Sequence, residues 1–142
     1  MNIYFSCSLT GGRTDEGVYG AIVDYLLAQG HRVPTAHLAR SDVMALEQAV
    51  KPAEAYRRDV QWIEEADVLI AEVSTPSHGV GYEIALALSL GKQALCCYQQ
   101  DVRVSKMITG NTDPRLTLGP YPDAAGALRV VRRFLEGISE SV

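Results

Sequence analysis

The sequence predicts a single α/β domain, an open and mainly parallel five-stranded sheet with helices on both faces. Two observations predict this class. Short apolar runs of strand-forming residues alternate along the chain with longer segments whose apolar residues recur at helical spacing. The 142 residues, of which 47% are apolar, are enough to bury one core. We therefore expect residues 1–142 to form one domain, with a frayed tail over 137–142.

The N-terminal half contains two predicted strands and three predicted helices. The strands are Asn2–Cys7 and a weaker one over His31–Ala36. The helices are Thr14–Gln29, a short one over 41–50, and Pro52–Asp67. Gly30 ends the first helix, and Pro52 suits the first position of the third, where its missing N–H needs no partner.

The C-terminal half continues the alternation. The predicted strands are Val68–Val73, Gln93–Tyr98 and Arg115–Leu118, and the predicted helices are Gly81–Leu90 and Asp123–Glu136. Residues 99–114 are predicted to form a polar loop with an apolar insert, which consists of Val102, Val104, Met107 and Ile108. Because apolar side chains are unfavourable in a solvated loop, the insert either forms a short helix or packs on a second subunit.

The repeated strand-helix-strand rhythm implies right-handed crossovers between parallel strands, in the order 2-1-3-4-5 of flavodoxin-like and Rossmann-like folds. In such sheets ligands bind outside the carboxyl ends of the strands, where the strand order reverses. That point lies between the first and third strands, so we expect the loops over 8–13 and 74–81 to lie side by side.

Composition and charge argue against several classes of function. Net charge is −4, with 13 basic and 17 acidic side chains spread along the chain, so no nucleic-acid polymer is expected as a partner. No apolar run reaches membrane-spanning length and the first residues lack a signal-peptide pattern, which predicts a cytoplasmic protein. The cysteines Cys7, Cys96 and Cys97 lack metal-site spacing and are interpreted as reduced core thiols.

Glu83 is the first candidate for chemistry. It ends the segment Ser77–Glu83, which follows an apolar strand and precedes a helix-forming stretch. The predicted helix places it in the first turn, where the partial positive charge of the helix N-terminus favours an ionised carboxylate and a nearby phosphate. A nucleophile suits that position, although a glutamate there can also merely stabilise its helix.

The two expected ligand loops contain glycines and carry the hydroxyls of Ser8 and Ser77. The loop over 8–13 has no Gly-Lys-Ser/Thr ending, and Gly79-Val80-Gly81 lacks the third glycine of a dinucleotide-binding motif, so ATP and NAD sites are not indicated. The loops are suited to a single phosphate, and their composition also fits ordinary turns.

Three segments resemble one known family. They are Ile3–Arg13, Arg58–Val68 (RDVQWIEEADV) and Ala71–Glu83 (AEVSTPSHGVGYE). In this order they resemble the 2'-deoxynucleoside 5'-phosphate N-hydrolases, within the nucleoside 2-deoxyribosyltransferase superfamily. The likeness runs from Ile3 to about Gly110.

The resemblance implies a catalytic set. Glu83 matches the family nucleophile, which attacks the anomeric carbon and forms a glycosyl-enzyme intermediate that water opens. Tyr4 matches the tyrosine that positions this carboxylate, and Asp59 matches the second acid near sugar and base. Whether Asp59 gives the departing base its proton stays open. Taken alone, Tyr4 fits a core aromatic residue and Asp59 a solvated helix residue.

The same resemblance implies a substrate site without metal or cofactor. Ser8 and Ser77 match serines that hold the 5'-phosphate, and the neighbouring loop positions are Leu9, Gly11, Gly12, Arg13, Gly79 and Gly81. Ser105 resembles a serine supplied by the neighbouring subunit, which implies a homodimer; the alternative is a lid over the chain's own site. His37 is a candidate pocket residue on the base side.

One departure from the family concerns the phosphate. Thr10 stands where the hydrolases carry arginine, which removes a permanent cation from that loop. His78 replaces an apolar residue in the neighbouring loop and could compensate when it is protonated.

The leading hypothesis is hydrolysis of the N-glycosidic bond of a (2'-deoxy)nucleoside 5'-monophosphate, which yields free nucleobase and (deoxy)ribose 5-phosphate. A nucleoside 2-deoxyribosyltransferase, in which a second base resolves the intermediate, is one alternative. A non-catalytic nucleotide-binding module is another. The sequence does not determine the preferred base or the choice between ribose and deoxyribose.

Overall fold

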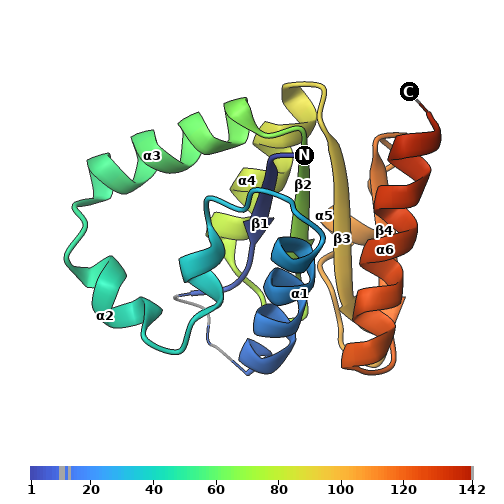
Figure 1. Cartoon of the computed structure of the whole chain (residues 1–142), viewed down its shortest axis with the longest axis horizontal. Coiled ribbons are helices and arrows are strands. Elements are labelled where there is room, and N and C mark those ends of the chain that lie inside the picture. The colour runs from blue at the N-terminus through green and yellow to red at the C-terminus, as the bar shows by residue number, and fades with distance from the viewer. Residues whose placement is uncertain (10–11, 13, 142) are drawn as a thin grey trace.

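The residues described by the computed structural model, 1–9, 12 and 14–141, form a four-stranded parallel sheet with helices on both faces (Figure 1). The strands are β1 (Ile3–Ser6), β2 (Val68–Glu72), β3 (Gln93–Gln99) and β4 (Leu116–Tyr121). Their order in the sheet is β1-β2-β3-β4, and each neighbouring pair is parallel. The α/β class and the parallel sheet are therefore confirmed.

Two pairs of long helices cover the sheet, and each pair closes one hydrophobic cluster. One face carries α1 (Glu16–Ala28) and α6 (Ala124–Glu140), and the other carries α3 (Pro52–Glu65) and α4 (His78–Ser89). The short elements are the 3-10 helix η1 (Ala36–Ala39), α2 (Val43–Gln48) and α5 (Lys106–Thr109). In Figure 1, α2 lies at the outer end of α3, away from the sheet.

The prediction of a strand over His31–Ala36, the second of the five predicted strands, is wrong, so the sheet that the structure describes has four strands instead of five. Within the described residues, His31–Ala36 contributes only an isolated parallel bridge between Arg32 and Asn2, beside β1. Pairing stops there because Pro34 has no N–H and the chain turns, with the N–H of Ala36 donating to the carbonyl of Val33 at 3.0 Å. The N–H of Phe5, which a second strand would have bonded, donates instead to Oγ1 of Thr35 at 3.0 Å.

β1 sends alternate side chains to opposite faces of the sheet, as the period of two requires. Ile3 and Phe5 belong to the cluster under α1 and α6, whereas Tyr4 belongs to the cluster under α3 and α4. Ser6 follows Tyr4 by two residues and therefore points to the same face. β1 thus directs two hydroxyl-bearing side chains toward α4.

Two helix boundaries differ from the sequence-based ones. α4 begins at His78 instead of Gly81 because Ser77 caps it, with Oγ accepting from the N–H of Val80 at 3.4 Å. α6 continues to Glu140 instead of ending at Glu136, since Ile138 packs against the hydrophobic cluster and extends the apolar stripe. The apolar insert over 99–114 contains α5, as the short-helix alternative predicted.

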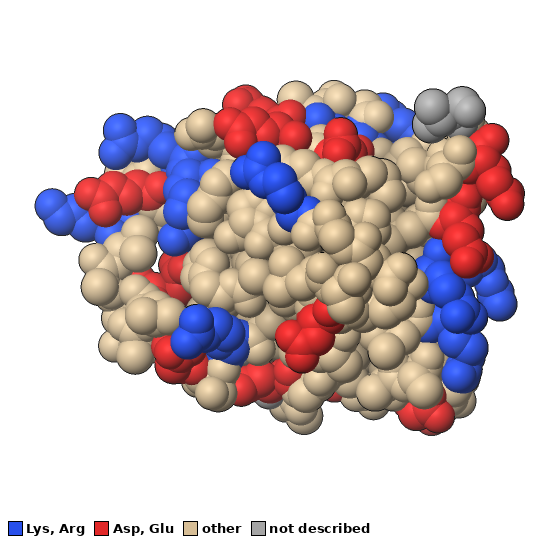
Figure 2. Space-filling model, in the orientation of Figure 1, with Lys and Arg blue, Asp and Glu red and all other residues tan. Residues whose placement is uncertain are grey.

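On the face drawn in Figure 2, charged side chains of both signs lie around the edge, while uncharged residues form most of the centre. Cys7, Cys96 and Cys97 are all buried, in agreement with their interpretation as core residues. Across the described ranges, no helix is both long enough and apolar enough to cross a membrane.

Candidate active site

Glu83 lies in the second turn of α4 and turns its carboxyl toward β1. Its Oε2 is buried, and so are the hydroxyls of Tyr4 and Ser6. Both hydroxyls are close enough to influence the carboxyl, yet none of these three oxygens has a hydrogen bond of good geometry with the described residues. Because unsatisfied buried polar groups are costly, this arrangement suits a site whose hydrogen bonds are completed by a ligand.

The ionisation of Glu83 is set mainly by burial. Burial raises its pKa to about 7, and the Tyr4 hydroxyl, the next largest influence, lowers it. The negative charge of Asp59 also raises the pKa, while Ser6 and Arg58 lower it. The sequence placed Glu83 in the first helical turn, where the helix terminus would favour its charge. α4 starts three residues earlier than expected, and desolvation outweighs that effect.

Tyr4 is fully buried on β1. Burial, together with the negative charges of Glu83 and Asp59, raises the pKa of its hydroxyl far above the usual range. The hydroxyl therefore stays protonated and can act as a hydrogen-bond donor beside Glu83. Such a donor can hold the carboxylate in one orientation.

Asp59 and Glu83 line one pocket of about 450 Å³ between α3 and α4. Its walls also include Tyr56, Tyr82 and Gly79. A side chain at Gly79 would lie 4.0 Å from Oε1 of Glu83, so the absence of a side chain there leaves room at the carboxylate. The fold brings both predicted carboxylates to one cavity.

The two predicted ligand loops also lie side by side. A Cβ at Gly12 would be 3.8 Å from Cγ2 of Thr75, and the φ of +119° at Gly12 is readily adopted only by glycine. Ser8 is buried, and Leu9 packs against the hydrophobic cluster. The predicted site residues Gly11 and Arg13, and the neighbouring Thr10, lie outside the described residues.

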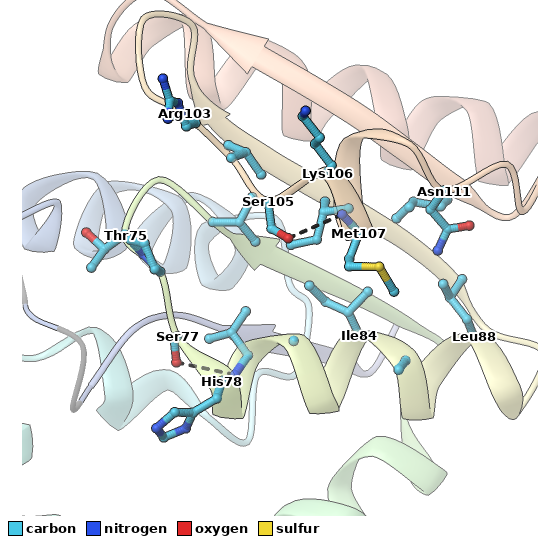
Figure 3. A pocket seen from close by; sticks show the side chains of 18 residues that line it. Thr75, Ser77, His78, Ile84, Leu88, Arg103, Ser105, Lys106, Met107 and Asn111 are labelled. Carbon is cyan, nitrogen blue, oxygen red and sulfur yellow. Dashed lines mark hydrogen bonds between the residues drawn. The ribbon is translucent and has the colours of Figure 1, made fainter.

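A larger groove of about 940 Å³ runs between α4 and residues 103–111, and Ser77, Gly81 and Ser105 line it. Figure 3 shows Ser77 and Ser105 on opposite sides of this groove. Ser105 also caps α5, since its Oγ accepts from the N–H of Met107 at 3.2 Å. His78 lines both this groove and the pocket of Glu83, so both cavities reach the start of α4.

Two basic residues, Arg103 and Lys106, are also part of the groove wall. Figure 3 shows their charged ends pointing away from α4. In this conformation they do not face Ser77, so the groove presents mainly hydroxyl and apolar groups to a ligand at the start of α4.

His37 lines neither of these two cavities. Its Nε2 is 2.8 Å from Oε1 of Glu47, and its ring centroid is 6.0 Å from that of Trp62. His37 is thus linked to the pocket only indirectly, because it contacts Glu47, which in turn contacts α3, the helix that carries Asp59.

Sequence reasoning missed two residues beside the carboxylates. Ser6 faces Glu83, and the signal was the two-residue spacing from Tyr4 on a strand. Arg58 donates from Nε to Oδ1 of Asp59 at 2.9 Å. A signal for Arg58 was weaker, because adjacent residues on a helix do not usually face each other.

Comparisons with known proteins give a consistent result. A sequence model described as "Nucleoside 2-deoxyribosyltransferase" matches residues 3–118. The chain is 38% identical over 133 residues to "Putative 2'-deoxynucleoside 5'-phosphate N-hydrolase 1" of Methanosarcina barkeri, which covers 94% of this chain and 84% of that protein. It is 40% identical over 116 residues to the 5-hydroxymethyl-dUMP N-hydrolase of Rattus norvegicus, which covers 79% of this chain and 71% of that protein.

One solved structure supports the fold independently. The CMP N-glycosidase of Clostridium botulinum aligns with a TM-score of 0.71 over 93% of this chain and 98% of its own. The two sequences are 19% identical in that alignment, so this likeness is evidence for a shared fold.

Proposed function

The chain belongs to the nucleoside 2-deoxyribosyltransferase family, and on that premise we propose that it is an enzyme that hydrolyses the N-glycosidic bond of (2'-deoxy)nucleoside 5'-monophosphates. The products are free nucleobase and (deoxy)ribose 5-phosphate. The observation that carries the proposal is the pocket in which Asp59 and Glu83 meet, with the Tyr4 hydroxyl buried beside Glu83. The relatives named as N-hydrolases support hydrolysis as the outcome.

In the proposed mechanism the ionised carboxylate of Glu83 attacks the anomeric carbon. The bond from that carbon to the base breaks, its electron pair leaves with the base, and the base takes up a proton. This proton comes from water, and Asp59, held by Arg58 in the same pocket, is our candidate for the group that orients the sugar and the departing base. Water then attacks the glycosyl ester, loses a proton, and releases the sugar phosphate and the Glu83 carboxylate.

Tyr4 and Ser6 support the nucleophile in this scheme. Their hydroxyls lower the pKa of Glu83 and so increase the ionised fraction near neutral pH. Ser8, Gly12 and Ser77, with Gly11 and Arg13, are our candidates for the phosphate side of the site, and Leu9 is our candidate for its ribose side. Gly12 lies beside Thr75, so the two loops approach each other there.

We further propose that the chain works as a homodimer in the cytoplasm, with Ser105 completing the partner's site. The groove that carries Ser105 is largely apolar, and Met107 in its wall is 85% exposed. A continuous apolar surface of this kind suits contact with another protein. Ser77 lies across the same groove, so a subunit seated there would be next to the start of α4.

The decisive experiment is base release from a panel of nucleosides and 5'-monophosphates, with ribose and with deoxyribose. We expect monophosphates to be cleaved and Glu83→Gln to lower kcat at least about a thousandfold. Glu64→Gln, an exposed carboxylate on α3, is the matched control and keeps the wild-type rate. Wild-type turnover by Glu83→Gln would rule out the assigned nucleophile.

Base exchange is the second candidate, because the matching family description names a deoxyribosyltransferase. In that reaction a second nucleobase, rather than water, opens the glycosyl ester. Adding a competing base to an unphosphorylated deoxynucleoside separates the two reactions. Formation of the exchanged nucleoside, without dependence on phosphate, would favour the transferase.

A further inference from the structure

A network of charged side chains next to the pocket of Glu83 connects α3, α2 and η1. Arg58 on α3 donates from Nε to Oδ1 of Asp59 at 2.9 Å. Its Nη2 donates to Oε2 of Glu47 on α2 at 3.2 Å, and its Nη1 lies 3.2 Å from Oε1 of the same carboxylate. Nε2 of His37 on η1 lies 2.8 Å from Oε1 of Glu47.

The guanidinium of Arg58 is held on several sides. Two carboxylates bind its nitrogens, and its central carbon lies 4.9 Å from the ring centroid of Trp62. The side chain is 24% exposed and that of Glu47 is 16% exposed, so solvent screens these pairs less than it would screen surface pairs. A planar guanidinium suits this arrangement because it binds carboxylates through two nitrogens and stacks on aromatic rings.

Glu47 also fastens α2 to the rest of the molecule. Of the six residues of α2, only Val43 is buried. The helix lies at the outer end of α3 in Figure 1, and its carboxylate Glu47 reaches both Arg58 and His37. These contacts therefore link the position of α2 to the position of Arg58.

We propose that Arg58 is a positioning residue for the reaction: it fixes the Asp59 carboxylate and offsets its negative charge beside Glu83, while Glu47 and His37 hold the guanidinium in place. This inference rests on the proposed function, because it assigns Asp59 and Glu83 to the reacting pocket. The positive charge of Arg58 reduces the repulsion between the Asp59 and Glu83 carboxylates, which line the same pocket.

The electrostatics agree with this role. Asp59 raises the pKa of Glu83 and Arg58 lowers it, although burial is the larger influence. Burial alone would raise the pKa of Glu47, but the hydrogen bonds with Arg58 and His37 outweigh it and lower the pKa. Glu47 is thus ionised and can hold the guanidinium at neutral pH.

Other ionisable groups near Glu83 come from each surrounding element. Tyr4 faces it from β1, Asp59 and Arg58 act from α3, and His78 and the Tyr56–Tyr82 pair line the same pocket. Tyr4 stays protonated because burial raises its pKa. Within the part of the chain that the structure describes, Arg58 is the positively charged group among those that influence the pKa of Glu83.

The test is the pH profile of kcat/KM in three arginine variants. Activity requires ionised Glu83, and Arg58 lowers the pKa of that group, so its removal moves the acidic limb to higher pH. We expect Arg58→Gln to shift the limb upward by about 0.5–1 pH unit and to lower kcat about tenfold at pH 7. Arg58→Lys should keep the limb near its wild-type position and lose activity through poorer fixation of Asp59.

Arg57→Gln is the matched control. Arg57 precedes Arg58 on α3, is exposed, and donates from Nε to the carbonyl of Ala53 at 3.3 Å. Arg57→Gln should leave unchanged both kcat and the position of the acidic limb of the kcat/KM profile. An unshifted limb in Arg58→Gln, or a shift of the same size in Arg57→Gln, overturns the proposal.

A second readout does not need turnover. In protein with 13C-labelled glutamate carboxyls, the signal absent from Glu83→Gln reports the titration of Glu83 directly. We expect its midpoint to rise by about 0.5–1 pH unit in Arg58→Gln. An unchanged midpoint in Arg58→Gln overturns the proposal. If the midpoint rises in Arg58→Gln but the wild-type protein releases no base, the result supports the role of Arg58 and contradicts the proposed function.

Discussion

Two glutamates have buried carboxyl groups, Glu72 on β2 and Glu83 on α4, and burial raises the pKa of each to about 7. Their surroundings decide what they can do. Oε1 of Glu72 accepts from the hydroxyl of Ser74 and from that of Tyr121, and the residue is fully buried. Glu83 lines a pocket. We conclude that Glu72 is structural and that Glu83 is the carboxylate available to a ligand.

Glu72→Gln should make the protein's stability less dependent on pH. The pKa of Glu72 is raised from 4.5 to about 7 in the folded state, so the folded protein holds a proton that the unfolded chain releases. Its favourable contribution is complete below the unfolded pKa and is lost as pH rises through 7, up to about 3 kcal/mol. Glutamine cannot ionise, so this loss disappears.

Urea unfolding at pH 5.5 and pH 8 measures the effect. The change in unfolding free energy between the two pH values should be smaller in Glu72→Gln than in wild type. Glu83 contributes a change of the same sign to both proteins, so the difference isolates Glu72. Glu64→Gln, which alters an exposed side chain, should behave like wild type. Equal pH dependence in wild type and Glu72→Gln would contradict the assigned protonation.

At the level of single residues, sequence motifs indicated which residues are candidates for the site, but they did not indicate the surroundings of those residues in the folded protein. Tyr4, Asp59 and Glu83 could be singled out because each falls within a segment that resembles a family. The raised pKa values of Tyr4 and Glu83 could not be predicted, since they depend on which side chains bury these groups after folding. Arg58 was missed for the same reason: its partner Glu47 comes from α2, and no sequence pattern links those positions.

At the level of elements, apolar periodicity predicted α1, α2, α3, α4 and α6 and four of the five predicted strands, because each of those elements buries one face or both. It did not predict the 3-10 helix η1. It failed at His31–Ala36, where Pro34 interrupts pairing and a side-chain hydroxyl, that of Thr35, replaces the backbone partner of Phe5. It also placed the start of α4 late, since the cap at Ser77 depends on one hydrogen bond rather than on a repeating pattern.

The contact between β4 and α6 yields a prediction about element packing. Gly119 on β4 has no room for a side chain, because a Cβ there would overlap Cγ1 of Val130 and lie 3.2 Å from Cδ1 of Leu95. We expect Gly119→Ala to lower the unfolding free energy by about 1–3 kcal/mol. Gly137→Ala on α6 should instead raise it by about 0.5–1 kcal/mol, because alanine favours the helix and, beyond the neighbouring helix backbone, no atom of the described residues lies within 4 Å of that Cβ position.

Chemical unfolding of the single and double variants tests the packing argument. If the overlap with Val130 is the cause, Gly119→Ala should cost less in a Val130→Ala background than in wild type. An equal cost in both backgrounds would mean that the strain arises elsewhere. Stabilisation by Gly119→Ala would contradict close contact between the strand and the helix.

At the scale of the whole molecule, the resemblance predicted two sets of groups, and the fold assigns them to two cavities. Asp59 and Glu83 share the smaller pocket, while Ser77 and Ser105 share the larger groove. His78 borders both, so a ligand could extend from one into the other. The sequence could not decide whether Ser105 serves its own subunit or its partner, since that depends on which surface covers the groove.

Mixing two inactive or weakened variants decides between these arrangements. If each subunit supplies Ser105 to its partner, a mixed dimer of Glu83→Gln and Ser105→Ala subunits has one site with both defects and one site with neither. Co-expressed protein should then be more active than either variant alone. If the hydroxyl contributes about tenfold at each site, a typical substrate hydrogen bond, the mixture should be about threefold more active than Ser105→Ala, because about half of its dimers have one intact site. If Ser105 acts on its own subunit, every site keeps one defect and the mixture is no more active than the average of its components.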